Sequence, residues 1–286
     1  MIYNSSAEYQ AATSKRVLLF GMSGLGKTHL SNILRDGGAW FHYSVDYRIG
    51  TRYMGEHIVD NFKLEAMKNP FLRELLLGDS IYIASNITFN NLAPLSTYLG
   101  KPGDPARAGL AFEEYMRRQD LHQDAEIHAL LDTTRFISRA KSLYGYDNFV
   151  CDSGGSICEV VDPNDPDDPV LKELSDHLLL VWIEGSEAHT DELISRFVRA
   201  PKPMYYQPEF LMRSWAEYLR ENNVSEGEVD PDDFIRSTFA KALAHRQPRY
   251  RAMAQNWGVT IKAEDVAKVK SPSDFNKLIA QALEAQ

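Results

Sequence analysis

The sequence predicts an α/β fold in which a parallel sheet is covered by helices. Short apolar runs, long enough for strands, alternate with longer segments that have helical apolar spacing, as such folds require. A glycine-rich segment follows the first run directly, and a helix is expected after it at residues 28–35, ended by Gly37-Gly38. The expected strands lie at about residues 16–20, 39–45, 148–152, 178–184 and 258–262, with 81–84 as a further candidate.

The first apolar run leads into a phosphate-binding loop, the P-loop. Residues 21–28 match the pattern G-x-x-x-x-G-K-T, and they are Gly21, Met22, Ser23, Gly24, Leu25, Gly26, Lys27 and Thr28. The glycines let successive backbone N–H groups point at phosphate oxygens, Lys27 supplies a cation for the β- and γ-phosphates, and Thr28 offers a hydroxyl to Mg²⁺. A glycine turn that matches by chance is the alternative, and the preceding strand disfavours it. The segment predicts a nucleoside triphosphate site.

A long insertion separates the second expected strand from the third. About 100 residues intervene, whereas a βαβ crossover takes about 30. Residues 86–109 are rich in Asn, Pro and Gly and predict a loop, and the apolar spacing in 110–144 predicts a helix. We therefore expect a nucleotide-binding core at 1–85 and 147–286 and a helical insertion at 86–146.

Two further segments predict loops. Residues 162–169 contain three prolines and four aspartates and are expected to form a solvated loop, with a cation site as the alternative. Prolines follow an expected helix in residues 196–208, which makes this segment a candidate lid over the nucleotide.

Two aspartates follow expected strands. Ligands of open α/β sheets bind beyond the carboxyl ends of the strands, so Asp46 could accept a proton from an acceptor hydroxyl or hold that hydroxyl in line. A helix N-cap is the alternative for Asp46. Asp152 ends an apolar strand in the Walker B pattern, whose carboxylate binds Mg²⁺. Gly154 and Gly155 follow it and either let a substrate approach the backbone or form a tight turn.

Several arginines are candidates to bind anions. Arg48 and Arg52 follow Asp46 and could pair with an anionic substrate. Arg196 and Arg199 lie in the candidate lid, where closure would exclude water and stabilise the charge of the transition state. Each of them is alternatively an ordinary surface residue. The histidines, His42 among them, have no metal-ligand spacing and are expected to be structural or solvated.

The bulk composition excludes some classes of protein. The chain has 286 residues, of which 44% are hydrophobic, and its net charge of −9 disfavours a sequence-independent nucleic-acid binder. Cys151 and Cys158 lack a His or Cys cluster, so we expect reduced core cysteines of a cytoplasmic protein. We also expect no signal peptide and no membrane span, because no apolar stretch approaches the roughly 20 residues that a bilayer requires.

These motifs resemble the small-molecule kinase branch of P-loop proteins, and the shikimate kinases above all. The loop has that branch's form G-x-x-G-x-G-K-T, and Asp46 falls where the family has a substrate-binding aspartate. Arg73 is similar to a substrate arginine, Gly154 and Gly155 to a glycine-rich substrate loop, and Arg246-x-Pro-x-Tyr to an Arg-x-Pro-Leu-Tyr segment. The resemblance implies a three-layer core with a five-stranded parallel sheet of order 2-3-1-4-5. It also implies ATP and Mg²⁺ as cofactors and transfer of the γ-phosphoryl group to a hydroxyl.

The sequence departs from this family at three places. Ser44 replaces an acidic residue, Ser156 replaces a third glycine, and the insertion at 86–146 has no counterpart. We therefore expect an ATP-dependent kinase with an unidentified acceptor larger than shikimate. The alternative is an ATPase switch, or a partner-coupled ATPase whose insertion contacts another protein.

Overall fold

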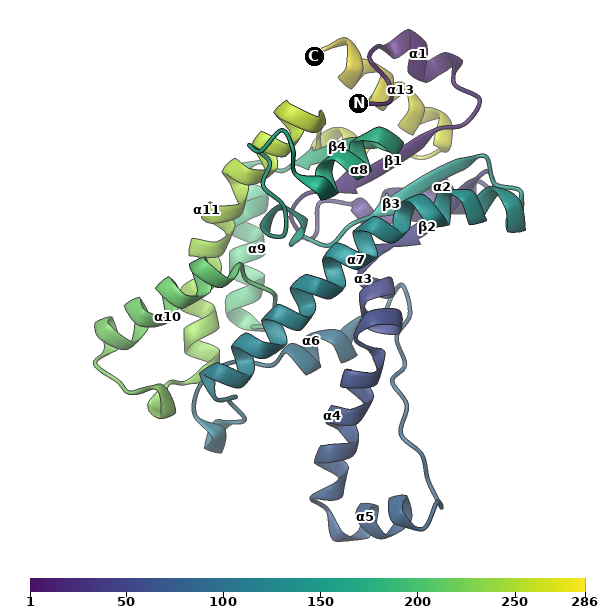
Figure 1. The fold of residues 1–286 in the computed structure, drawn as a ribbon. Coiled ribbons are helices and arrows are strands. Elements are labelled where there is room, and N and C mark those ends of the chain that lie inside the picture. Colours follow the sequence, from purple (N-terminus) through teal and green to yellow (C-terminus); the bar gives the residue numbers. More distant parts are fainter. Residues whose placement is uncertain (286) are drawn as a thin grey trace. The chain divides into compact units, whose positions relative to one another are not determined.

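The computed structural model describes residues 1–285 and contains a five-stranded, all-parallel sheet (Figure 1). The strand order is β2-β3-β1-β4-β5, which confirms the order that the resemblance implies. The five expected strands are confirmed to within one residue at each end. They are β1 (Arg16–Phe20), β2 (Trp40–Ser44), β3 (Asn148–Asp152), β4 (Leu179–Glu184) and β5 (Gly258–Lys262).

The sixth candidate strand is wrong. Residues 81–84 have no regular secondary structure, and the Tyr82 side chain is 88% exposed. A run of apolar residues forms a strand only where a neighbouring strand completes its hydrogen bonds, and this run has no such neighbour in the described part of the chain.

Contacts divide the chain into two units. Unit 1 comprises residues 1–45, 126–201 and the described residues from 236 onward, and unit 2 comprises 46–125 and 202–235. This division differs from the expected insertion at 86–146, because the second half of helix α7 (Phe112–Tyr144) packs in unit 1. There the Tyr43 hydroxyl donates to the Ala129 carbonyl over 2.6 Å. A continuous helical pattern does not reveal where along a helix its packing partners change.

Helices cover both faces of the sheet in unit 1. Side chains alternate between the faces of a strand, so Trp40 and His42 of β2 point away from Phe41 and Tyr43. Trp40 contacts Phe275 of α13 (Pro272–Glu284), whereas Tyr43 contacts Phe136 of α7. The remaining helices of this unit are α1 (Ser6–Ala11), α2 (Lys27–Asp36), α8 (Pro169–His177), α9 (Glu187–Arg199), α12 (Ala263–Val266) and most of α11 (Pro231–Trp257), with a 3₁₀ turn at Ile157–Glu159.

Elements from the two ends of the sequence meet in unit 1. Helices α1 and α13 lie side by side (Figure 1), and the Tyr9 hydroxyl donates to Asn276 Oδ1 over 2.8 Å. Both cysteines are buried and neither forms a disulfide, as expected, and burial raises the pKa of the Cys158 thiol. Among the described residues, no helix has the length and apolar character needed to cross a bilayer.

Unit 2 is helical. Its clusters of aromatic residues include the stacked pair of Phe112 and Trp215, whose ring centroids are 4.6 Å apart, and Phe234 packs edge-on against Trp215. The unit holds most of α3 (Val45–Arg48), a π-helical turn (Ile49–Tyr53), α4 (Gly55–Met67), α5 (Pro70–Leu77), α6 (Ala93–Leu99), the first part of α7, α10 (Pro208–Asn222) and the start of α11, with 3₁₀ turns at Pro105–Arg107 and Glu226–Glu228.

The expectation of a loop throughout 86–109 is wrong, because α6 lies within it. Pro94 occupies the first turn of α6, where the missing N–H of proline has no helical partner to lose. The buried side chains of Leu95, Tyr98 and Leu99 then hold the helix in place.

The aspartate-rich segment 162–169 is a loop, as expected, but it is not uniformly solvated. Asp168 is buried and caps α8, because its Oδ1 accepts from the backbone N–H groups of Val170 and Leu171. Asp168 Oδ2 also accepts from the Asp162 N–H over 2.8 Å. Hydrogen bonding within the protein therefore explains this aspartate.

Candidate nucleotide-binding site

The P-loop between β1 and α2 has a backbone that only glycine adopts easily. Gly21, Gly24 and Gly26 have φ values of 135°, 82° and 99°. A Cβ on Gly21 would lie 2.7 Å from the Ile183 carbonyl oxygen, and one on Gly26 would lie 2.8 Å from Val266 Cγ1. The loop is therefore pressed against the sheet and α12, and the glycines are required by sterics as well as by conformation.

Lys27 lies across the P-loop at the first position of α2. Its Nζ donates to the carbonyl oxygens of Gly21 and Met22 over 2.8 and 3.0 Å, and the residue is buried. The N-cap residue Gly26 makes no side-chain capping bond, so the amides of the first helical turn are not occupied by a capping side chain. A buried ammonium beside uncapped amides makes the start of this helix electropositive, which suits phosphate.

Thr28 and Asp152 meet at the carboxyl end of the sheet. The Thr28 hydroxyl donates to Asp152 Oδ2 over 2.8 Å, although 124 residues separate them. The parallel pairing of β1 with β3 places the end of β3 beside the P-loop. Hydroxyl and carboxylate oxygens are hard ligands, and Mg²⁺ takes few protein ligands because it retains several waters. This pair of side chains therefore fits a nucleotide-bound Mg²⁺.

His42 is a residue of this site that the sequence reasoning missed. Its side chain is 1% exposed and its Nε2 lies 3.8 Å from Asp152 Oδ2. The register pairs Ser44 with Asp152 and His42 with Val150, so His42 lies on the same face of the sheet as Asp152. The spacing of His42 and Ser44 was available in the sequence, but the pairing of β2 with β3 was not.

The segment after β3 folds back against the P-loop. The Ser153 hydroxyl donates to the Leu19 carbonyl over 2.9 Å, and the Tyr250 hydroxyl donates to the Gly155 carbonyl. A Cβ on Gly155 would lie 3.5 Å from Ser23 Oγ and 3.8 Å from Arg246 Nη1. Gly155 and Arg246, both predicted to contact substrate, thus lie near the P-loop.

Arg246 forms a buried ion pair that the sequence did not reveal. Its Nη2 donates to Glu159 Oε2 over 2.6 Å, and the two side chains are 8% and 0% exposed. The neighbouring Arg249 donates to the carbonyls of Cys158 and Val161 over 2.6 and 2.8 Å. Helix α11 thereby holds the whole segment after β3, which gives Arg246 a structural role in addition to any contact with substrate.

The structure separates the two lid arginines. A Cβ on Gly24 would lie 2.9 Å from Arg196 Nη2, so the Arg196 guanidinium lies against the P-loop. Arg196 Nε also lies 3.6 Å from Glu192 Oε1, an exposed pair that water screens. Arg199 is exposed and its Nε donates to the Ser195 carbonyl one turn earlier in α9.

The remaining candidates belong to unit 2. Asp46 and Arg48 lie in α3, where the Arg48 guanidinium is 5.6 Å from the centre of the Tyr53 ring. Arg73 is exposed on α5, and Arg52 is exposed in the π-helical turn. Their roles toward a nucleotide or an acceptor stay predictions.

No known family model and no curated protein sequence matches the chain. Among solved structures, a shikimate kinase from Bacteroides thetaiotaomicron is similar with a TM-score of 0.38 and 15% identity, over 96% of this chain and 98% of that one. Similarity at this level does not identify a reaction. The strand order and the P-loop after β1 are the observations that classify the chain. The chain has an all-parallel α/β fold with a P-loop after its first strand.

Proposed function

We propose that unit 1 binds ATP with Mg²⁺ and that the chain transfers the γ-phosphoryl group to a hydroxyl of an unidentified acceptor. The observation that carries this proposal is the contact between Thr28 and Asp152, 2.8 Å apart at the end of the P-loop. If the glycine turn matched the motif only by chance, a carboxylate at the end of a strand would not be expected beside the threonine of the turn.

Catalysis of phosphoryl transfer depends mainly on positioning of the reactants and neutralisation of the phosphate charge. Lys27 and the loop amides hold the β- and γ-phosphates in line with the acceptor. Thr28 and Asp152 would hold Mg²⁺, which would supply neutralisation of the phosphate charge. Arg196, which lies against Gly24, stabilises the charge that develops on the transferred group.

The acceptor oxygen attacks the γ-phosphorus as the bond to the β–γ bridging oxygen breaks and ADP leaves. Asp46 takes the hydroxyl proton, a role that rests on the position of Asp46 after β2 and on the sequence resemblance. Gly155 and Arg246 are our candidates for acceptor contacts because they lie near Ser23 of the P-loop. Gly154, Arg48 and Arg73 are further candidates from the sequence.

One observation favours a second function, a partner-coupled ATPase. Helices α4 and α5 follow each other in the helical unit (Figure 1). Within residues 64–82, which span the end of α4 and all of α5, four large apolar side chains are exposed, namely Leu64 at 67%, Phe71 at 68%, Leu77 at 70% and Tyr82 at 88%. Clusters of exposed apolar residues often mark protein interaction sites. The stretch precedes residues 86–146, the insertion that contacts another protein in the alternative interpretation of the sequence.

The test is to incubate the full chain with γ-labelled ATP, Mg²⁺ and a fractionated cell extract. The kinase proposal expects label in a small-molecule product, and Lys27→Ala removes that product. Release of free phosphate alone, stimulated by the macromolecular fraction, favours the partner-coupled ATPase. Absence of ATP binding in calorimetry with folded protein overturns both.

A further inference from the structure

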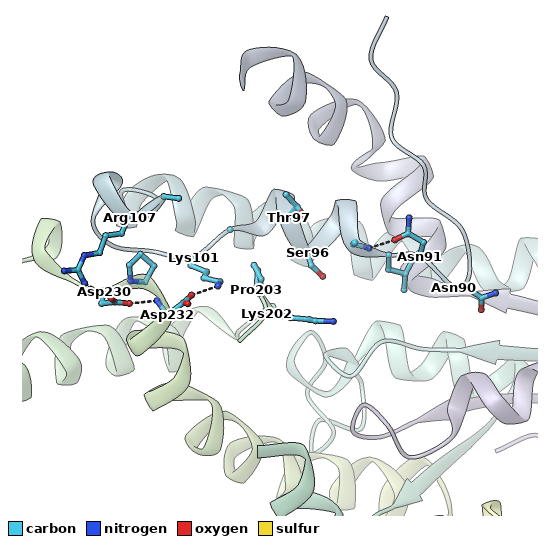
Figure 2. Close-up of a pocket in the computed structure, with 15 residues that line it drawn as sticks. Asn90, Asn91, Ser96, Thr97, Lys101, Arg107, Lys202, Pro203, Asp230 and Asp232 are labelled. Carbon is cyan, nitrogen blue, oxygen red and sulfur yellow. Dashed lines mark hydrogen bonds and ion pairs between the residues drawn. The ribbon is translucent and has the colours of Figure 1, made fainter. Parts of the chain in front are cut away.

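A cavity of about 800 Å³ lies within unit 2, and none of the candidate residues of the nucleotide site lines it (Figure 2). Small-molecule sites typically enclose about 300–1,000 Å³. The cavity is lined from two stretches that are far apart in the sequence, residues 90–108 and 202–232. The sequence reasoning assigned neither stretch a ligand site of its own, although residues 202–208 belong to the candidate lid.

Several contacts hold the two stretches together. Arg107 Nη1 donates to Asp230 Oδ2 over 2.6 Å, and Lys101 pairs with Asp232 (Figure 2). At Gly103, where φ is 138°, a Cβ would lie 2.4 Å from the Val229 carbonyl oxygen, so only glycine permits this approach of the two backbones. The walls are therefore fixed by ion pairs and close packing, as expected for a preformed site.

The charges that line the cavity are not balanced. Lys101 and Arg107 each face a carboxylate, and Asp230 Oδ1 also accepts the backbone N–H groups of Asp232 and Asp233 over 2.9 and 3.1 Å. Hydrogen bonds from the Asp233 backbone and from Arg107 lower the pKa of Asp230, so it stays ionised and paired. Lys202 is the third cation of the lining, and it forms no ion pair within residues 1–285.

The uncharged part of the lining is mixed, since hydrogen-bonding side chains lie beside the apolar residues Leu92, Ala93, Ala108, Pro203 and Pro231. Asn90, Asn91, Ser96 and Thr97 supply amides and hydroxyls from one stretch, opposite Lys202 and Pro203 from the other. Figure 2 shows the Ser96 side chain directed toward the stretch that carries Lys202. One excess cation beside neutral polar and apolar groups suits a small anion that carries hydroxyl groups on a carbon skeleton.

We propose that this cavity binds a small hydroxylated organic anion, whose carboxylate or phosphoryl group contacts Lys202. Ser96 and the Asn90 amide bind its hydroxyl groups, whereas the Asn91 amide is held by the backbone of Asn86 and Ala93. Because the chain as a whole has a net charge of −9, the overall field of the protein repels anions. The attraction for the anion therefore comes from the residues that line the cavity. This site does not depend on ATP binding by unit 1.

The test uses three probes with one carbon skeleton, glycerol 3-phosphate, glycerate and glycerol, titrated into the full chain by calorimetry and by NMR of the Ser96 and Thr97 amides. We expect saturable binding of at least one anion and none of glycerol, and the anion that binds identifies the preferred group. Lys202→Ala weakens that binding by about tenfold or more, equivalent to about 1.4 kcal/mol. Lys63→Ala, an exposed lysine of the same unit, leaves it unchanged.

Failure of both anions to reach saturation, or an equal response to glycerol, overturns the proposal. Because the P-loop also attracts phosphoryl groups, each titration is repeated with Lys27→Ala, in which binding at the cavity persists. Binding that is lost in Lys27→Ala but retained in Lys202→Ala assigns the anion to the P-loop and also overturns the proposal. Lys202 is exposed, so its replacement is not expected to affect folding.

Discussion

The replacement Glu159→Gln tests the buried ion pair with Arg246. It removes the negative charge of Glu159 and keeps the volume of the side chain. The two groups are 2.6 Å apart and are 0% and 8% exposed, so Glu159→Gln leaves a buried guanidinium without its counter-charge. Breaking such a pair costs about 3–5 kcal/mol. We expect a loss near the lower end of this range, because the glutamine oxygen can still accept a hydrogen bond.

The assay is urea unfolding followed by fluorescence. With a slope of about 3 kcal/mol/M, a loss of about 3 kcal/mol lowers the midpoint by about 1 M. The double variant Glu159→Leu with Arg246→Met removes both charges and should recover most of this loss, since apolar replacements of buried pairs are often neutral or stabilising. Asp167→Asn, an exposed acid on the same segment, serves as the control.

A midpoint that moves by less than about 0.3 M in Glu159→Gln would refute this reasoning, because the m-value converts that shift to under about 1 kcal/mol. It would mean that the pair is solvated. Arg246 would then be better explained as a residue that contacts substrate alone. A kinetic readout separates the two roles, because a purely structural arginine changes stability without changing the KM for the acceptor.

Three further predictions concern the site and the helical unit. Thr28→Val should raise the Mg²⁺ concentration needed for half-maximal activity by about tenfold, since it removes the hydroxyl beside Asp152, and an unchanged Mg²⁺ titration contradicts that assignment. Asp46→Asn should leave the ATP affinity measured by calorimetry unchanged and abolish transfer of the labelled phosphoryl group. Transfer at the wild-type rate would instead assign Asp46 a structural role. Hydrogen bonding from Arg117 lowers the pKa of Glu114 from 4.5 to about 2, so its stabilising effect is complete above about pH 4.5 and is lost as the pH falls toward 2. The stability gap between the wild type and Glu114→Gln should therefore narrow over that pH range in thermal unfolding, and a constant gap contradicts the pairing.

The strands and the P-loop were predictable because local pattern determines them. Residues 17–20 of β1 (Arg16–Phe20) are a continuous apolar run, and the glycines of the loop are needed for backbone angles that other residues resist. The Asn, Pro and Gly content of residues 86–109 predicted a loop and hid α6, because a proline such as Pro94 in the first turn of a helix looks in the sequence like a proline in a loop.

The partners of the site residues were not predictable. Thr28 and Asp152 were expected to share a metal because both belong to known patterns, but nothing in the sequence pointed to His42 beside Asp152 or to Glu159 beside Arg246. Each of these contacts joins residues about 90 or more positions apart. They depend on which strands and helices become neighbours, and composition and spacing carry little information about that choice.

The sequence by itself determined the α/β class, the five strands and a loop shaped for phosphate, because backbone sterics and apolar periodicity act within a few residues. Only the tertiary structure decided where the two units divide, which arginine lies against the P-loop, and that Lys202 lines a cavity with an excess of positive charge. The physical reason is that side-chain packing and charge pairing act between elements that are distant in the chain, and folding alone brings them together.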